Sequence, residues 1–164
     1  NQVVEIIGEA LNSEVCSIYL LREGVLELFA TRGLSPDAVH VTKLALGEGL
    51  VGTIAANVET LNLAEAASHP DFAYKPETGE ELFHSFAGVP IIRRERSVGV
   101  LAVQHADPRK YADVEIEALQ TEQLMQMEAM MASHYRAEAL ERARQLAEAE
   151  RGRARTRAFL GSPD

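Results

Sequence analysis

Five histidines and one cysteine are the residues of this 164-residue chain best suited to metal binding or nucleophilic catalysis. The histidines form no H-x-x-x-H pair, and Cys16 has no second cysteine with which to form a C-x-x-C pair. Metal sites usually draw on such closely spaced ligands. No G-x-S-x-G motif is present, and Ser17 lies within a predicted strand and not on the sharp turn that carries a nucleophilic serine. The sequence predicts no metal site, no cofactor and no catalytic residue, and an inert, buried thiol at Cys16.

Carboxylates gather in a polar segment at Glu77, Glu80 and Glu81. A pair of carboxylates can act as general acid and base, as in glycoside hydrolysis. A solvated loop face has the same composition. Both interpretations remain open for this segment.

Three glycines at a spacing of two and three residues, Gly47, Gly49 and Gly52, open an apolar run that predicts a short helix over residues 50–56. Glycine permits φ > 0, and a helix N-terminus offers free N–H groups to a carbonyl or anionic ligand. The dinucleotide fingerprint also needs a buried parallel strand directly before the glycines, whereas residues 41–44 alternate between apolar and polar. The local pattern favours a structural turn over a phosphate cradle.

Hydrophobic periodicity predicts the elements that position these residues. Apolar residues at helical spacing predict a helix over residues 2–12, and a helical pattern begins again at Asp113, a candidate N-cap, and continues beyond residue 150. Residues 64–85 are polar and irregular, which is typical of a lid or binding loop. Alternation and turn signals predict strands over residues 15–21, 25–31, 39–44, 59–63, 86–92 and 97–104, with hairpin turns at Glu23-Gly24 and Arg93 to Arg96.

These elements predict an α+β fold. Two hairpins and extra strands, with helices at both chain ends, give an antiparallel sheet. The terminal helices are expected on one face of this sheet, and the short helix and the lid on the other.

The formal net charge of −9 is concentrated in residues 1–135, which carry 9 basic and 20 acidic side chains. An acidic body argues against nucleic acid as the main partner.

No window of 18 consecutive apolar residues exists, so the sequence predicts no membrane span and no membrane partner. A single cysteine and the lack of a basic leader predict a cytoplasmic protein without a signal peptide.

Seven sequence blocks in the same order carry a resemblance to the GAF family, over about residues 3–125. More narrowly, they resemble the GAF domains at the N-terminus of enzyme I of the nitrogen-related phosphotransferase system. The resemblance implies a six-stranded, mainly antiparallel sheet with helices on both sides. The blocks are EVCSIYL at 14–20, ATRGL at 30–34, GEGLVG at 47–52, LNL at 61–63, HPDF at 69–72, FAGVPI at 86–91 and GVL at 99–101.

The resemblance also implies a function. Residues 1–125 would be a sensory domain, and residues 126–164 a helical linker to downstream phosphotransferase domains. A small-molecule effector, glutamine or another small metabolite, would control phosphoenolpyruvate-dependent autophosphorylation in the parent phosphoenolpyruvate-protein phosphotransferase. Residues 139–159 also resemble the linker helices of sensor histidine kinases, so a kinase input domain is an alternative. A dimerisation module with an empty pocket is another.

Strand alternation assigns faces of the sheet. Val15, Ser17 and Tyr19 share one face of their strand, and the neighbouring residues, all apolar, share the other. The polar face suits a small ligand, and the apolar face suits the terminal helices. In the last strand, Ala102 and Gln104 share a face.

Comparison with ligand-binding GAF domains implies the contacts of an effector. For an amino acid, Arg32 would bind the carboxylate. Glu77 or Glu80 would bind the amino group, and Gln104 the side-chain amide. The predicted ligand-binding residues are Ser17, Thr31, Arg32, Leu50, Val51, Tyr74, Glu77, Glu80, His84, Ala102 and Gln104.

The C-terminal helix predicts a homodimer. Its apolar residues recur at steps of three and four, but the stripe is interrupted around His134 and has few strong core residues. A helix this long needs a packing partner beyond about residue 135. The pattern predicts a weak, parallel coiled coil. The stripe consists of Leu124, Met127, Met131, Leu140, Ala143 and Ala147.

Overall fold

The computed structural model describes residues 2–79 and 83–160. The chain divides into two units, Asn1–Met125 and Gln126–Asp164. Within the C-terminal helix, the side chains described are those of residues 132–133 and 135–154.

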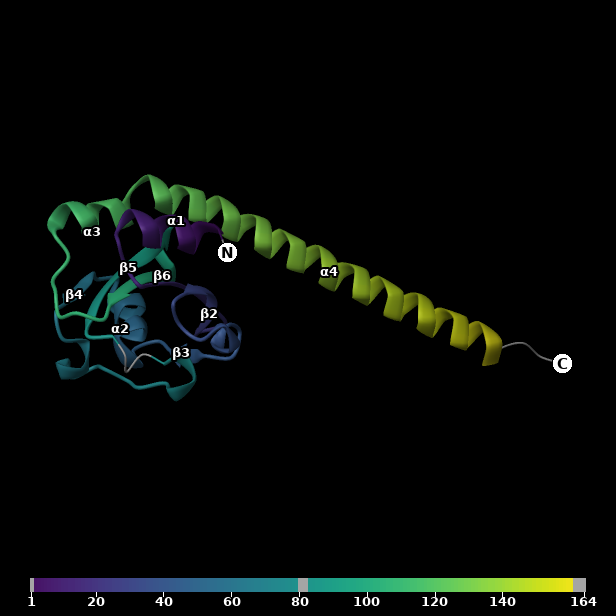
Figure 1. Cartoon of the computed structure of the whole chain (residues 1–164). Helices are drawn as coiled ribbons and strands as arrows, with labels where there is room; N and C mark the ends of the chain where they lie inside the picture. The colour runs from purple at the N-terminus through teal and green to yellow at the C-terminus, as the bar shows by residue number, and fades with distance from the viewer. Residues whose placement is uncertain (1, 80–82, 161–164) are drawn as a thin grey trace. The chain divides into compact units, whose positions relative to one another are not determined.

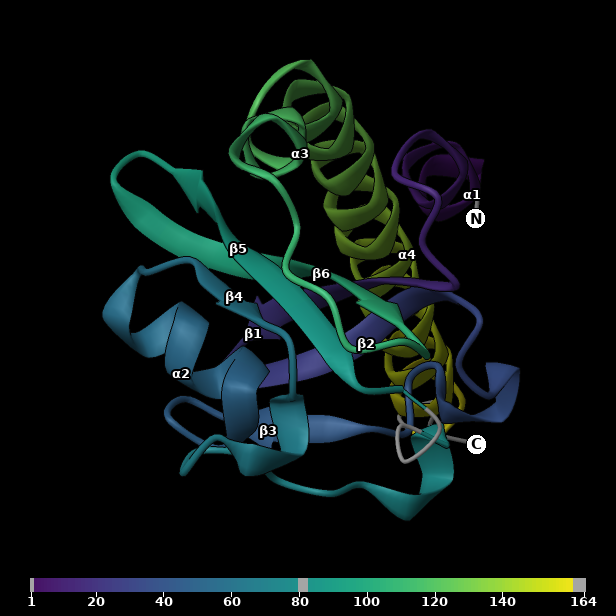
Figure 2. The same ribbon diagram turned by 60° about the vertical axis from the view of Figure 1, so that its left-hand side comes forward.

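Six strands form one antiparallel sheet, as predicted, in the order β3-β2-β1-β6-β5-β4. Figure 1 shows the whole chain, and Figure 2 labels all six strands. The two long hairpins, β1-β2 and β5-β6, pair with each other through β1 and β6. The first hairpin turns at Glu23-Gly24, where both residues have positive φ. The strands are β1 Val15–Arg22, β2 Val25–Arg32, β3 Lys43–Ala45, β4 Leu61–Leu63, β5 Ser85–Arg93 and β6 Arg96–His105.

Helices cover both faces of the sheet in the first unit. Figure 2 shows α1 and α3 on one side and α2 on the other. α1 packs against β1 and β2 through Val4 and Ile7, which its helical spacing places on one face. α3 packs against β5, and α2 against β3, β5 and β6. The helices are α1 Gln2–Ala10, α2 Gly49–Asn57, α3 Asp113–Gln120 and α4 Glu122–Leu160.

The core between the sheet and α2 confirms the predicted faces of β1. Ser17 pairs with Ala102, and Tyr19 with Val100, so these residues share the α2 face. Tyr19 joins the buried cluster that α2 completes through residues such as Ile54. Apolar side chains on both sides of the contact exclude water, which is the main stabilising contribution to the packing.

The third predicted strand, residues 39–44, is wrong in its extent, because β3 covers only Lys43–Ala45. The Ala38 carbonyl accepts a hydrogen bond from the Thr42 N–H at 2.9 Å, which closes a turn. His40 has a φ of 64°, which is incompatible with an extended strand. The turn therefore interrupts the strand here, although His40 and Thr42 still make backbone hydrogen bonds to Leu28 of β2.

The helical region after residue 112 also differs from the prediction. Ala112, not Asp113, is the N-cap of α3, and the Glu115 carboxylate accepts a hydrogen bond from its N–H at 2.7 Å. Thr121, with φ −104° and ψ −133°, interrupts the helix between α3 and α4. A single helix from residue 113 is therefore incorrect.

In the second unit, α4 has a charged surface. Arg144 and Glu148 form an i,i+4 ion pair at 3.4 Å. Leu140 and Leu146 are 72% and 67% exposed. Of the predicted apolar stripe, the side chains of Leu124, Met127 and Met131 lie outside the described residues. Among the residues that the structure describes, no helix is both long and apolar enough to cross a membrane.

Candidate functional site

The lid, residues 64–84, connects β4 to β5 and crosses the α2 side of the sheet. Its described part contains two 3-10 turns, Ala66–Ser68 and Pro76–Thr78. The carbonyl of Thr78 accepts a hydrogen bond from the Ser35 N–H at 3.1 Å. Glu77 accepts one from the Thr42 hydroxyl at 3.2 Å. These contacts fold the lid over the sheet without regular secondary structure.

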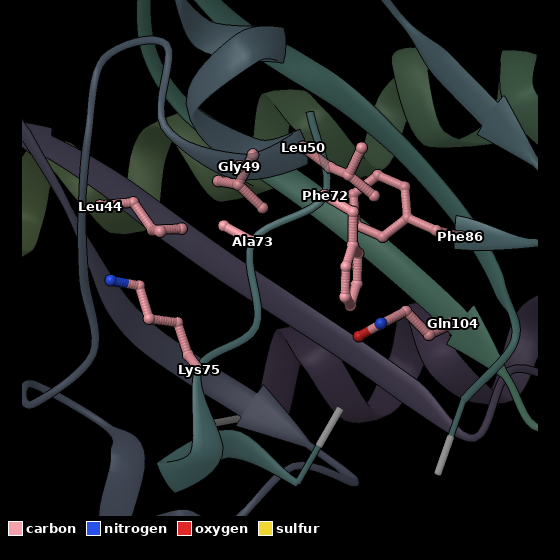
Figure 3. Close-up of a pocket in the computed structure, with 9 residues that line it drawn as sticks. Leu44, Gly49, Leu50, Phe72, Ala73, Lys75, Phe86 and Gln104 are labelled. Carbon is pink, nitrogen blue, oxygen red and sulfur yellow. The ribbon is translucent and has the colours of Figure 1, made fainter. Parts of the chain in front are cut away.

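A cavity lies beneath the lid, between the start of α2 and strand β6 (Figure 3). Its volume is about 20 Å³, enough for about one water molecule. The aromatic residues Phe72 and Phe86 form part of its wall. The residues that line it are Leu44, Gly49, Leu50, Val51, Phe72, Ala73, Lys75, Phe86 and Gln104.

Gln104 provides an amide group in this cavity. The residue is only 4% exposed, and its side chain makes no hydrogen bond among the described residues. Figure 3 shows its amide directed toward Phe72. The amide atoms are not among the fully buried atoms without a partner in the described part of the chain, so they keep some access to the cavity and are available to a ligand.

Lys75 is the charged side chain among the described residues that line the cavity. Its Nζ lies 2.8 Å from Oε1 of Glu48, the N-cap residue of α2. Oε2 of Glu48 accepts a hydrogen bond from the Ala45 N–H at 2.9 Å. The bonds from Lys75 and then Ala45 lower the pKa of Glu48, so the carboxylate stays ionised at neutral pH.

The glycine string before α2 forms the turn that brings this helix to the cavity. Gly47 and Gly49 have φ values of 83° and 67°. A Cβ atom on Gly49 would lie 3.2 Å from Cβ of Ala73 in the lid. Glycine therefore allows both the turn and the close approach of the lid.

A second hollow, of about 420 Å³, opens elsewhere on the first unit. It lies beside the end of α1 and contains Arg32 and His105. Nε2 of His105 lies 3.4 Å from Oε1 of Glu14. The residues that line it are Gly8, Glu9, Asn12, Ser13, Glu14, Arg32 and His105.

Comparison with known proteins agrees with this fold. The GAF domain family model matches residues 1–128. The chain belongs to the GAF family. It is 38% identical over 123 residues to a phosphoenolpyruvate-dependent phosphotransferase system protein of Escherichia coli (strain K12), a match that covers 74% of this chain and 16% of the relative. The chain thus spans about a sixth of the length of that relative.

Two solved GAF domains of phosphoenolpyruvate-protein phosphotransferases are similar in structure. The domain from Coxiella burnetii has a TM-score of 0.74 and 36% identity, with 84% of this chain and 82% of that chain covered. The domain from Acinetobacter has a TM-score of 0.72 and 33% identity, with 83% and 81% covered. The fold and sequence resemblance to this group of GAF domains is therefore confirmed.

Three residues of the predicted site, Leu50, Val51 and Gln104, line the cavity of the GAF domain. Ser17 and Thr31 lie on the same face of the sheet, where their hydroxyl oxygens are 2.8 Å apart. Ala102 pairs with Ser17 on this face and is buried. These last three are neighbours of the cavity but are not part of its wall.

The predicted lid residues that the structure describes, Tyr74, Glu77 and His84, do not line the cavity. Tyr74 is 48% exposed. Glu77 bonds to Thr42, as described above, and His84 pairs with Glu65 at 2.9 Å. Glu80 lies outside the described residues.

Arg32 is a correction to the predicted site. It pairs with Cys16 across β1 and β2, so it lies on the α1 face, opposite to Thr31. Its Nε lies 3.2 Å from Glu5 of α1. Consecutive residues of a strand point to opposite faces, so Thr31 and Arg32 cannot both reach the cavity. The guanidinium group cannot share a ligand with Gln104 in this structure.

The sequence interpretation missed several wall residues. Phe72 and Phe86 both occur in the blocks that resemble the family, HPDF and FAGVPI, which was a usable signal. Lys75 lies in an irregular segment without periodicity, so no local pattern indicated that it would face the cavity.

Cys16 is buried, and burial raises the pKa of its thiol to about 12, which leaves almost no thiolate at neutral pH. Among the described residues, no group of three or more histidine, cysteine or acidic residues is placed to hold a metal ion.

Proposed function

We propose that this GAF domain is the regulatory, small-molecule-sensing part of a cytoplasmic phosphoenolpyruvate-protein phosphotransferase of the nitrogen-related system. Its effector is an amino acid such as glutamine, which binds in the cavity under the lid. Effector binding controls autophosphorylation by downstream phosphotransferase domains, and this chain itself performs no catalysis. The similarity to GAF domains of phosphoenolpyruvate-protein phosphotransferases supports this parent protein.

The observation that carries the proposal is the amide of Gln104, which lines the cavity and has no hydrogen-bond partner among the residues that the structure describes. A primary amide offers two donor hydrogens and a carbonyl acceptor. The side-chain amide of glutamine can pair with it through two hydrogen bonds. Leu50, Val51 and Phe86 provide the apolar wall for the methylene groups of such a ligand.

The size of the cavity implies that binding moves the lid. A volume of about 20 Å³ does not hold an amino acid. Phe72, Ala73 and Lys75 all come from the lid, so an outward movement of one segment enlarges the cavity. Irregular segments with few backbone bonds are the parts of a fold that open at the lowest free energy.

A thermal-shift screen with glutamine, other amino acids, 2-oxoglutarate and cyclic nucleotides tests the proposal. At 100 times the Kd, a ligand stabilises the folded state by about 2.7 kcal/mol. We expect glutamine to raise the melting temperature of the wild-type chain and of a Gln145→Leu control, which changes an exposed amide of α4. Gln104→Leu should abolish the shift. No shift with any amino acid, or a shift with cyclic nucleotides alone, would contradict the proposal.

A second candidate function is a dimerisation module without a ligand. The small cavity volume and the exposed Leu140 and Leu146 of α4 favour it. A sensor histidine kinase is the alternative parent protein. The sequence that follows Asp164 in the full protein separates the two parents, because a phosphohistidine domain and a kinase phosphoacceptor helix differ in sequence.

A further inference from the structure

The lid is attached to the start of α2 by one ion pair at the edge of the cavity. Lys75 contributes the cation from the lid, and Glu48 contributes the anion from the N-cap of α2. We propose that these two side chains recognise the charges of a free α-amino acid: Lys75 binds the carboxylate and Glu48 binds the ammonium group. This assignment rests on the proposed function of the cavity as an amino acid site.

The position of the pair fits this role. Lys75 lines the cavity, and Glu48 directly precedes Gly49, which also lines it. Their charged atoms, Nζ and Oε1, are 2.8 Å apart. An amino acid that enters the cavity carries both a carboxylate and an ammonium group. When Lys75 and Glu48 separate, the carboxylate becomes the new partner of Lys75 and the ammonium group becomes the new partner of Glu48.

The exposure of the pair makes such an exchange favourable. The side chains of Lys75 and Glu48 are 26% and 42% exposed. Ion pairs that are partly solvated contribute little net stability. Charge-assisted hydrogen bonds to a ligand that is enclosed by the lid are stronger. Binding therefore replaces one weak, partly solvated ion pair by two charge-assisted contacts to the ligand.

No other basic residue in the described part of the first unit lines the cavity. Arg32 is paired with Glu5 on the opposite face of the sheet, and Arg109 is paired with Glu115 at 2.8 Å. Among the described wall residues, Lys75 is therefore the group that can bind a carboxylate.

Lys75 and Gln104 together define the orientation of the ligand. In Figure 3 the ammonium group of Lys75 lies toward Leu44, and the amide of Gln104 lies toward Phe72. The backbone charges of an amino acid would lie at the α2 edge of the cavity, and its polar side chain would extend toward β6. Lys75 belongs to the lid and Glu48 to the N-cap of α2. The ligand must separate these two side chains in order to bind both, so the lid opens as the charges of the ligand are recognised.

Calorimetric titration of the 164-residue chain with three probes tests the assignment. The probes are L-glutamine, L-glutaminamide, which lacks the carboxylate, and N-acetyl-L-glutamine, which lacks the ammonium group. The wild-type chain should bind L-glutamine roughly 10- to 100-fold more tightly than either analogue, the range expected for one charge-assisted contact. Lys75→Met should remove the preference over L-glutaminamide, and Glu48→Gln the preference over N-acetyl-L-glutamine.

Two further variants serve as controls. Lys43→Met removes an exposed lysine of β3 that does not line the cavity, and should keep every preference of the wild type. Lys75→Arg retains the charge and should keep the preference for the free carboxylate. Far-ultraviolet spectra and melting temperatures establish that each variant is folded.

The outcomes separate this assignment from the function on which it rests. If a folded Lys75→Met variant still prefers L-glutamine over L-glutaminamide, the assignment of Lys75 is wrong, while the cavity remains an amino acid site. If Lys75→Arg loses the preference for L-glutamine over L-glutaminamide, as Lys75→Met is expected to, then recognition of the carboxylate through a positive charge at this position is wrong. If the wild-type chain binds none of the three probes or any other amino acid, both the assignment and the proposed function are wrong.

Discussion

The hydroxyl oxygen of Tyr111 lies 3.0 Å from Oγ of Ser13, although 98 residues separate the two in sequence. Both residues are buried. Tyr111 precedes α3, and Ser13 lies between α1 and β1. Burial raises the pKa of Tyr111, so its hydroxyl stays protonated at neutral pH. The bond joins the two ends of the first unit.

Removal of this hydroxyl should destabilise the domain. We expect Tyr111→Phe to lower the free energy of unfolding by about 1 kcal/mol, since it leaves the Ser13 hydroxyl without this partner. Ser13→Ala should have a similar effect, and urea unfolding measures both. In the double variant, the two effects should not add, because both remove the same bond. Full additivity would show that the bond contributes nothing.

Asn62 should be important for stability although it belongs to a strand of three residues. Its Nδ2 donates to the Tyr111 carbonyl at 2.8 Å, and its Oδ1 accepts from the Tyr111 N–H at 3.0 Å. Asn62→Ala should lower the unfolding free energy by about 2 kcal/mol, the sum of two such bonds. The control Asn57→Ala changes an exposed residue at the end of α2 and should change it by less than about 0.5 kcal/mol. Equal effects in chemical denaturation would contradict the role of Asn62.

Gly52 should not tolerate a side chain. A Cβ atom at this position would lie 2.5 Å from the carbonyl oxygen of Ala45, a backbone atom that cannot move alone. Gly52→Ala should lower the unfolding free energy by about 1–3 kcal/mol through overpacking. In Gly152→Ala, the added atom meets nothing within 4 Å in α4, and alanine should favour the helix by about 1 kcal/mol. Thermal unfolding of the two variants should therefore give shifts of opposite sign.

The stability contributed by Glu48 should depend on pH. Its pKa is lower in the folded state than the ordinary value of 4.5, because of Lys75 and then Ala45. A lowered folded pKa means that the contribution is complete above the unfolded pKa and is lost as the pH falls through the folded value. The difference in unfolding free energy between wild type and Glu48→Gln should therefore be constant above about pH 5 and decline at lower pH. Urea unfolding over this range measures it, with Glu117→Gln as an exposed control. A difference that does not change with pH would exclude the ionised Glu48 as its source.

The C-terminal helix should mediate a parallel homodimer. Leu140 and Leu146 are exposed in the single chain, and a partner helix would bury them. Sedimentation should show a dimer for the complete chain and a monomer after truncation at Ala132, at about tens of micromolar. If both chains sediment as monomers, or both as dimers, the helix is not the dimer contact.

The sequence alone determined the elements whose residues alternate or repeat regularly. The β1-β2 hairpin, with Glu23-Gly24 at its turn, follows from local propensity and the positive φ that its turn requires. The shared face of Ser17 and Tyr19 follows from strand alternation, and the structure then pairs Ser17 with Ala102 on this face. The ordered blocks of the GAF family then identified the fold and made Leu50 and Val51 candidates for the cavity, and strand alternation added Gln104.

Only the tertiary structure decided which residues complete the cavity. Arg32 could have been excluded by alternation, but its partner Glu5 is on a separate helix that the local sequence does not place. Lys75 faces the cavity because hydrogen bonds to residues more than 30 positions away hold the lid, as between Glu77 and Thr42. Periodicity describes how neighbouring residues share a face. It contains no information about an irregular segment, whose side chains are oriented by the surfaces on which it packs.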